Sequence, residues 1–307
     1  MSFGQDLKDM FDVLTKGSHY IEVELFTKLQ DALLLLEKRY GPYGIKLIHG
    51  ERSKVTFTVC EDWVSGAKAS VKKRELADMF FIVLSPSAKK IRCFFLQNKS
   101  CRNFLTSRST HYFYADLIQL DLLKNRSEFK YNEKECSILS SAKLSSIASY
   151  GVFYHDGNFN YDMAYIPGDK IKPVNTFGKA LIRSVKCKAL WNKVVSINGN
   201  SQLDGCETMI KFADGMINMN IGEPICSLKT VGYICGKEVE KKCRELLDDK
   251  DENAWDEIDS NNLDEILMER FGQCNGTAVK TIVIINADTI RNETDTNKVN
   301  LKKNWLF

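Results

Sequence analysis

The stretch ELADMFFIVLSPSAKKIRCFFLQNK, residues 75–99, decides the fold of this chain. Two apolar runs within it, MFFIVL at 79–84 and IRCFFL at 91–96, are separated by a segment rich in Ser, Pro and Lys, which are typical of a turn. Continuous apolar runs of this length are typical of strands that are buried on both faces. The sequence therefore predicts two adjacent central strands of a sheet, joined by a short connection.

Helices and further strands are predicted on both sides of this pair. Residues 25–40 place apolar side chains at helical spacing, and Gly41-Pro42 ends that helix. Residues 54–60 alternate apolar and polar side chains, as a half-buried strand does. Residues 111–126 are expected to form a second helix and residues 150–154 another strand. The expected fold class is α/β, with a central mixed sheet flanked by helices.

The second half of the chain gives weaker patterns. Residues 176–189 and 262–271 are candidates for helices, and VKTIVIIN at 279–286 has the pattern of a buried strand. These patterns suggest two parts: a core over residues 1–170, and a C-terminal α+β extension over residues 171–307 that packs on it.

Length and composition fit a globular protein. The chain has 307 residues, of which 44% are hydrophobic, enough to bury a sizeable core. Its N-terminus lacks the pattern of a signal peptide, and its apolar runs are far shorter than a membrane span, so we expect a cytoplasmic protein with no membrane association. The ten cysteines show no zinc-ligand spacing, and we expect neither a structural zinc ion nor a disulfide framework.

The net charge of +3 conceals two oppositely charged segments. Residues 68–108 contain ten basic residues and two acidic ones, a local charge of +8. Residues 245–269 contain eleven acidic residues and one lysine, a local charge of −10. The basic segment should attract phosphate groups and the acidic segment should repel them.

Polar residues gather where the two central strands begin and end. Glu75 and Asp78 precede the first strand, and Gln97, Asn98 and Lys99 follow the second, so an antiparallel pair brings these ends together. Gln97 and Lys99 are two residues apart and are expected to share a face with Asp78. Carboxylate and amide oxygens beside an ammonium group are the groups that metal-dependent hydrolysis of a phosphodiester requires.

The order of elements and these residues resemble the PD-(D/E)xK nuclease superfamily, which includes restriction endonucleases and DNA-repair nucleases. In this resemblance Asp78 matches the metal ligand that leads the strand, and Lys99 matches the motif lysine. Gln97 stands where most members have Asp or Glu, and Glu75 is similar to an auxiliary acid. Gln119, on the predicted helix, is similar to a glutamine that some branches place near the site.

The resemblance implies a restriction-endonuclease-like core and a Mg²⁺- or Mn²⁺-dependent endonuclease that cuts DNA in bacterial restriction, repair or antiviral defence. Asp78, with Glu75 or Gln97 and the Asn98 carbonyl, would bind the metal, and Gln97→Glu should then retain cleavage. A second copy of the chain or a partner defence subunit would be its protein partner. The residues expected to contact nucleic acid are Lys72, Lys73, Arg74, Arg102, Arg108 and Gln119.

Two other functions remain open from the sequence. Because Gln97 replaces a carboxylate, the chain could be an inactive module of the same fold that binds nucleic acid or a partner protein. Alternatively, the acidic segment 245–269 could dock on a basic partner or mimic DNA. Phosphate-binding loops of the GxxxxGK[ST] type and GxSxG nucleophile elbows do not occur in the sequence, which disfavours motor, kinase and serine-hydrolase functions.

Overall fold

The computed structural model describes residues 2–49, 54–60, 69–101, 110–155, 161–172, 179–183, 193–197, 200–204, 208–247 and 278–304. Several predictions from the sequence lie outside these residues: the helix at 262–271, most of the acidic segment 245–269, and the candidate nucleic-acid contacts Arg102 and Arg108.

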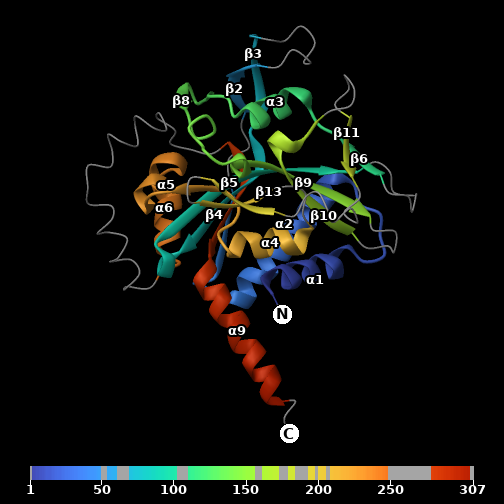
Figure 1. Ribbon diagram of the computed structural model, residues 1–307, viewed down its shortest axis with the longest axis vertical. Coiled ribbons are helices and arrows are strands. Elements are labelled where there is room, and N and C mark those ends of the chain that lie inside the picture. Colours follow the sequence, from blue (N-terminus) through green and yellow to red (C-terminus); the bar gives the residue numbers. More distant parts are fainter. Residues whose placement is uncertain are drawn as a thin grey trace.

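The largest element is a mixed seven-stranded sheet (Figure 1). Its strand order is β1 (Ile45–His49), β15 (Val279–Asn286), β4 (Ala77–Ser85), β5 (Lys90–Ser100), β9 (Ala148–His155) and β10 (Tyr161–Pro167), with β14 (Glu223–Ile225) also paired to β5. The two central strands predicted from the sequence are β4 and β5, which are antiparallel and joined through the short 3-10 helix η1 (Pro86–Ala88). Strand β9 is parallel to β5, and β15 is parallel to β4.

Three smaller sheets accompany the central one. One has the order β3 (Val71–Glu75), β2 (Lys54–Thr58), β7 (Phe129–Tyr131) and β8 (Lys134–Cys136). The others are two-stranded: β6 (Thr110–Tyr114) pairs with β11 (Lys179–Arg183), and β12 (Lys193–Ile197) pairs with β13 (Asn200–Asp204).

Helices cover both faces of the central sheet because β4 is apolar on both. Phe80, Ile82 and Leu84 belong to one core, shared with α3 (Leu117–Asn125), α5 (Leu228–Cys235) and α6 (Lys237–Arg244). Met79, Phe81 and Val83 belong to the other, shared with α1 (Phe3–Thr15), α2 (Glu22–Tyr40), α4 (Met209–Ile217) and the start of α9 (Ala287–Asn304). Figure 1 shows α1 and α4 on one side of the sheet and α3 on the other. Among the described helices, none is long and apolar enough to cross a bilayer.

Strand β15 joins the two halves of the chain in one sheet. It lies between β1 and β4, antiparallel to the first and parallel to the second. The central sheet therefore continues past the boundary that the sequence suggested at residue 170. Strand β2, which was predicted as a half-buried strand, pairs with β3 and β7 in the separate four-stranded sheet. The place next to β4 is taken by β15.

Two predicted helices were wrong in part. The helix expected over 111–126 begins at Leu117, because the Asp116 side chain caps it by accepting hydrogen bonds from the backbone N–H groups of Ile118 and Gln119. The aromatic run before it forms β6, since aromatic residues favour strands. Within the segment 176–189, residues 179–183 form β11, which pairs with β6. That pairing partner cannot be read from local periodicity.

No disulfide framework was expected from the sequence, and one described cysteine, Cys136, is disulfide-bonded. Spacing along the sequence cannot show which distant cysteines meet. Six other described cysteines are not disulfide-bonded: Cys60, Cys93, Cys101, Cys226, Cys235 and Cys243.

Candidate functional site

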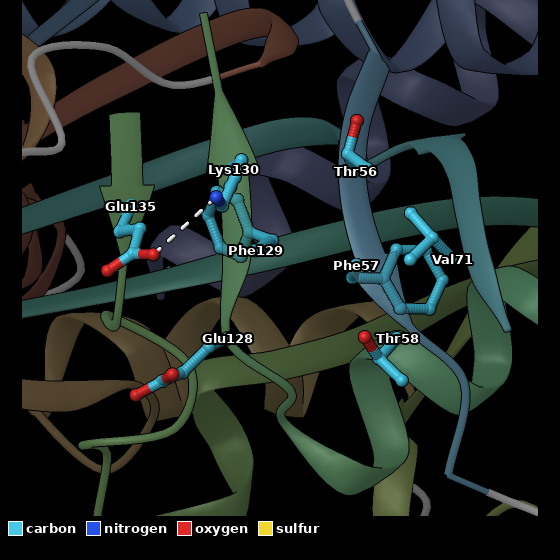
Figure 2. A pocket seen from close by; sticks show the side chains of 8 residues that line it. All are labelled: Thr56, Phe57, Thr58, Val71, Glu128, Phe129, Lys130 and Glu135. Carbon is cyan, nitrogen blue, oxygen red and sulfur yellow. Dashed lines mark ion pairs between the residues drawn. The ribbon is translucent and has the colours of Figure 1, made fainter. Parts of the chain in front are cut away.

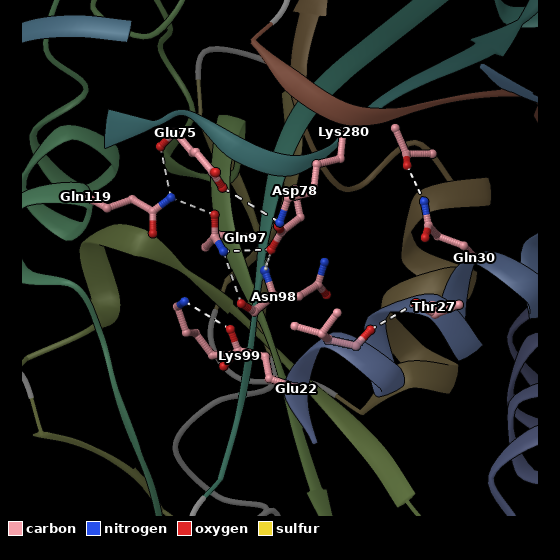
Figure 3. A network of polar contacts seen from close by, with 12 residues as sticks. Glu22, Thr27, Gln30, Glu75, Asp78, Gln97, Asn98, Lys99, Gln119 and Lys280 are labelled. Atoms are coloured by element: carbon pink, nitrogen blue, oxygen red, sulfur yellow. Dashed lines mark hydrogen bonds and ion pairs between the residues drawn. The ribbon is translucent and has the colours of Figure 1, made fainter. Parts of the chain in front are cut away.

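Asp78 is a buried carboxylate at the start of β4, and its side chain is 5% exposed. Its Oδ2 atom accepts hydrogen bonds from the Gln97 side-chain amide, at 2.6 Å, and from the backbone N–H of Asn98, at 2.8 Å. Both donors lie at the end of β5, so the antiparallel β4–β5 pair holds the carboxylate in place (Figure 3). Asp78 and Gln97 are therefore in contact, as the sequence predicted.

Gln97 presents its NH₂ group, and not its oxygen, to Asp78. A carboxylate can only accept, so the amide nitrogen must face it, and this nitrogen also donates to the Asn98 carbonyl at 3.1 Å. The Gln97 oxygen accepts a hydrogen bond of 2.7 Å from Gln119. In this orientation Gln97 is a hydrogen-bond donor that positions Asp78, and its oxygen faces Gln119 and not the carboxylates.

Gln119 comes from α3, and it also donates to the Glu75 backbone carbonyl at 2.9 Å. The start of α3 is fixed by Asp116, whose carboxylate forms an ion pair of 2.9 Å with Arg74 on β3. Arg74 was expected to contact nucleic acid, but its guanidinium is engaged with Asp116. This ion pair ties β3 to the start of α3, while nucleic-acid contact by Arg74, Lys72 and Lys73 stays a prediction.

Lys280 is a site residue that the sequence did not reveal. It lies on β15 at the level of Asp78, since the flanking register pairs are Val279 with Ala77 and Thr281 with Met79. Its ammonium contacts the Asp78 carboxylate and lies 3.7 Å from Glu75 Oε2. A lysine in a mostly apolar strand stands out in the sequence. Only the parallel pairing of β15 with β4, however, brings it to the site.

Lys99 does not join Asp78 as expected. Its ammonium pairs with Glu22 at 3.2 Å, and the second oxygen of that carboxylate accepts from the backbone N–H of Ser100. Glu22 begins α2, and Figure 3 shows Lys99 directed toward it. No pattern in the sequence singled out Glu22, because an acidic residue in the first turn of a helix is ordinary.

Asn98 points to the opposite face of β5 from Gln97, as the alternation of a strand requires. Its side chain is buried, and neither its oxygen nor its nitrogen has a hydrogen-bond partner within the part of the chain that the structure describes. Its backbone carbonyl, the expected metal ligand, accepts from Gln97.

Tyr150 borders the site from β9, where it is the register partner of Gln97. It is fully buried, and its hydroxyl has no hydrogen-bond partner among the described residues. Burial raises the pKa of Tyr150 well above its usual value, and the negative charges of Asp116 and Asp78 raise it further. The phenol therefore stays protonated and cannot serve as a base.

The residues fit a divalent cation at one position. Asp78 and Glu75 offer hard oxygen ligands, and both face the Lys280 ammonium, which marks where a positive charge is favoured. Among the described residues, no three His, Cys, Asp or Glu side chains form a metal-binding group. Two carboxylates are nevertheless a usual protein contribution to a Mg²⁺ site, because the ion keeps several waters and binds substrate phosphates.

A separate hollow of about 370 Å³ lies over the small sheet and is unrelated to this cluster (Figure 2). The buried rings of Phe57 and Phe129 line it, together with Val71 and an ion pair of 3.6 Å between Lys130 and Glu135. Its lysine is paired with Glu135, and its other charged group, Glu128, accepts a hydrogen bond from Ser137, so we assign no phosphoryl chemistry to this hollow.

Comparison of the chain with protein-family models, with curated proteins and with solved structures found no match. Its function must therefore be inferred from the geometry of the site.

Proposed function

We propose that the chain is a metal-dependent endonuclease that hydrolyses DNA phosphodiester bonds and has a restriction-endonuclease-like core. The observation that carries this proposal is the pair of carboxylates, Asp78 and Glu75, which both face one cationic group where β4 begins and β5 ends. An antiparallel β4–β5 pair, followed by α3 and the parallel strand β9, supports the same fold. Strand β2 lies in a separate four-stranded sheet.

Each residue of the site has a distinct task in this proposal. Asp78 and Glu75 would hold Mg²⁺ or Mn²⁺, which activates a water molecule and neutralises phosphate charge when bound. Gln97 and Gln119 keep the Asp78 carboxylate oriented through the bonds described above. Lys99 would leave Glu22 and place its ammonium against the phosphate, where negative charge develops during hydrolysis.

The biological setting follows from the family resemblance alone. Restriction, repair or antiviral defence in a bacterial cytoplasm is the setting in which such nucleases act, and a second copy of the chain would allow both strands to be cut.

A second candidate is an inactive module of the same fold that binds nucleic acid or a partner protein. The contact of Lys280 with Asp78 favours it, because this ammonium lies where a catalytic cation would bind. The two candidates differ in cleavage, and not in binding.

The direct test is incubation of supercoiled plasmid with the protein in Mg²⁺, Mn²⁺ or EDTA. We expect nicked or linear products with either cation and none in EDTA. Lys99→Met should reduce the rate by about 10²- to 10³-fold, the usual effect of removing one group that stabilises developing charge. Lys90→Met is the matched control, because Lys90 is an exposed lysine at the opposite end of the same strand. Intact plasmid in both cations, with retained DNA binding, would favour the inactive module.

DNA binding should depend steeply on salt because Lys72 and Lys73 lie on β3, which leads directly to Glu75. Each phosphate contact releases counterions and contributes a slope of about −0.9 to log K against log salt. The double variant Lys72→Gln/Lys73→Gln should therefore flatten the slope by roughly 1.8 in a fluorescence-anisotropy titration without cleavage-supporting cations. The same change at Lys89 and Lys90, at the far end of β4 and β5, should leave the slope unchanged. An equal slope in all three proteins would exclude β3 as a phosphate contact.

A further inference from the structure

We propose that Lys280 is a built-in counter-ion that occupies the cation position between Asp78 and Glu75, and that a divalent metal binds only by displacing it. This inference deepens the proposed function, because the metal in question is the one that the nuclease would use. It makes Lys280 a residue that sets the metal requirement of the site.

The contacts of Lys280 come from three different elements. Its ammonium reaches Asp78 on β4 and lies 3.7 Å from Glu75 at the end of β3, and it also lies 5.4 Å from the centre of the Phe26 ring on α2. The next residue, Thr281, accepts a hydrogen bond from Gln30 on α2. The backbone of β15 is therefore held at this level of the sheet, and only the side chain of Lys280 would have to move.

The charges explain why an ammonium is placed here. Two carboxylates that face the same point repel each other when no cation is between them, and repulsion is strong where Asp78 is buried. Lys280 neutralises part of this charge without a metal. A divalent ion at the same position would be repelled by the ammonium, so both cannot occupy it together.

The ammonium can leave because it is not enclosed. The Lys280 side chain is 27% exposed, and a lysine has a long flexible stem that can carry its charge into solvent. Displacement thus costs the ion pairs of Lys280, and this cost is subtracted from the affinity for the metal. Cation and lysine compete for the same two carboxylates.

The test is a titration of the metal-free full-length protein with Mn²⁺. The concentration of free Mn²⁺ is measured by electron paramagnetic resonance. We expect Lys280→Met to bind Mn²⁺ about tenfold more tightly than the wild type, because no ammonium then competes for the two carboxylates. Methionine keeps an apolar stem beside Phe26. Lys46→Met is the matched control. Lys46 lies on the neighbouring strand β1, away from the site, and forms an ion pair of 3.6 Å with Glu37. Its Mn²⁺ affinity should equal that of the wild type.

Two further variants show whether the bound ion is the one proposed. Asp78→Asn and Glu75→Gln, each made in the Lys280→Met background, should both weaken Mn²⁺ binding. Equal affinity of wild type and Lys280→Met, a gain that Lys46→Met reproduces, or a gain that survives both carboxylate changes would overturn the inference, as would the absence of any Mn²⁺ binding. Tighter binding without plasmid cleavage would support the competition and count against the nuclease, so the two proposals fail separately.

Discussion

Asp78→Asn is expected to lower the rate of DNA cleavage by at least about 100-fold, the scale of losing a group that fixes a catalytic metal. The variant removes one negative charge from the cation position but keeps an oxygen that can accept from Gln97 and from the Asn98 backbone. The fold should therefore survive, although an amide is a poorer partner for Lys280. Single-turnover cleavage of a labelled duplex in Mn²⁺ measures the effect, and thermal unfolding shows whether the variant is folded.

Asp288→Asn is the matched control for this measurement. Asp288 is also an ion-paired aspartate, bound to Arg291, and it accepts from the Ser85 hydroxyl at the opposite end of β4. Its replacement should cost stability and leave the cleavage rate per folded molecule unchanged. A folded Asp78→Asn protein that cuts at the wild-type rate would show that this cluster is not the active site.

Gln97→Glu is expected to destabilise the protein by about 2–4 kcal/mol at pH 7, whereas the sequence alone predicted retained cleavage for this variant. The Gln97 amide donates to Asp78 at 2.6 Å, whereas an ionised glutamate cannot donate and would face a second carboxylate. The oxygen that replaces the Gln97 amide nitrogen could not donate to the Asn98 carbonyl, so that hydrogen bond would also be lost. Chemical denaturation of wild type and variant in EDTA, where no metal can compensate, measures the loss.

The loss of stability caused by Gln97→Glu should increase as the pH rises. Burial and the charge of Asp78 would raise the pKa of the new carboxyl in the folded state above its usual value of about 4.3. A raised pKa means that the folded protein binds the proton more tightly, so the penalty is absent below about pH 4.3 and grows as pH rises through the folded pKa.

Gln30→Glu is the control for this change, because Gln30 donates to the Thr281 hydroxyl, which can donate back to a carboxylate. It should cost little at any pH. A stable Gln97→Glu protein at pH 7 that cleaves DNA at lower Mg²⁺ concentration would restore the view that residue 97 is a metal ligand.

Local sequence patterns determined the parts of this protein that depend on near neighbours. The apolar runs that became β4 and β5, the spacing that became α2 and the pattern of β15 were all predicted, because burial periodicity is a local property. The meeting of Asp78 and Gln97 was also predictable, since a short connection between antiparallel strands brings their outer ends together. The helix expected over 111–126 failed in its first part because β6 pairs with the distant strand β11.

Only the tertiary structure decided which groups complete the site. Lys280 is 202 residues from Asp78 in the chain, and their contact exists because β15 inserts between β1 and β4. The pairing of Lys99 with Glu22 likewise depends on where α2 begins against the end of β5. The orientation of Gln97 was decided by Gln119 on one side and a carboxylate on the other. Residue types fix which chemistry is available, but hydrogen bonds and ion pairs act over a few ångströms, so the partner of each charge is set by the packing of distant segments.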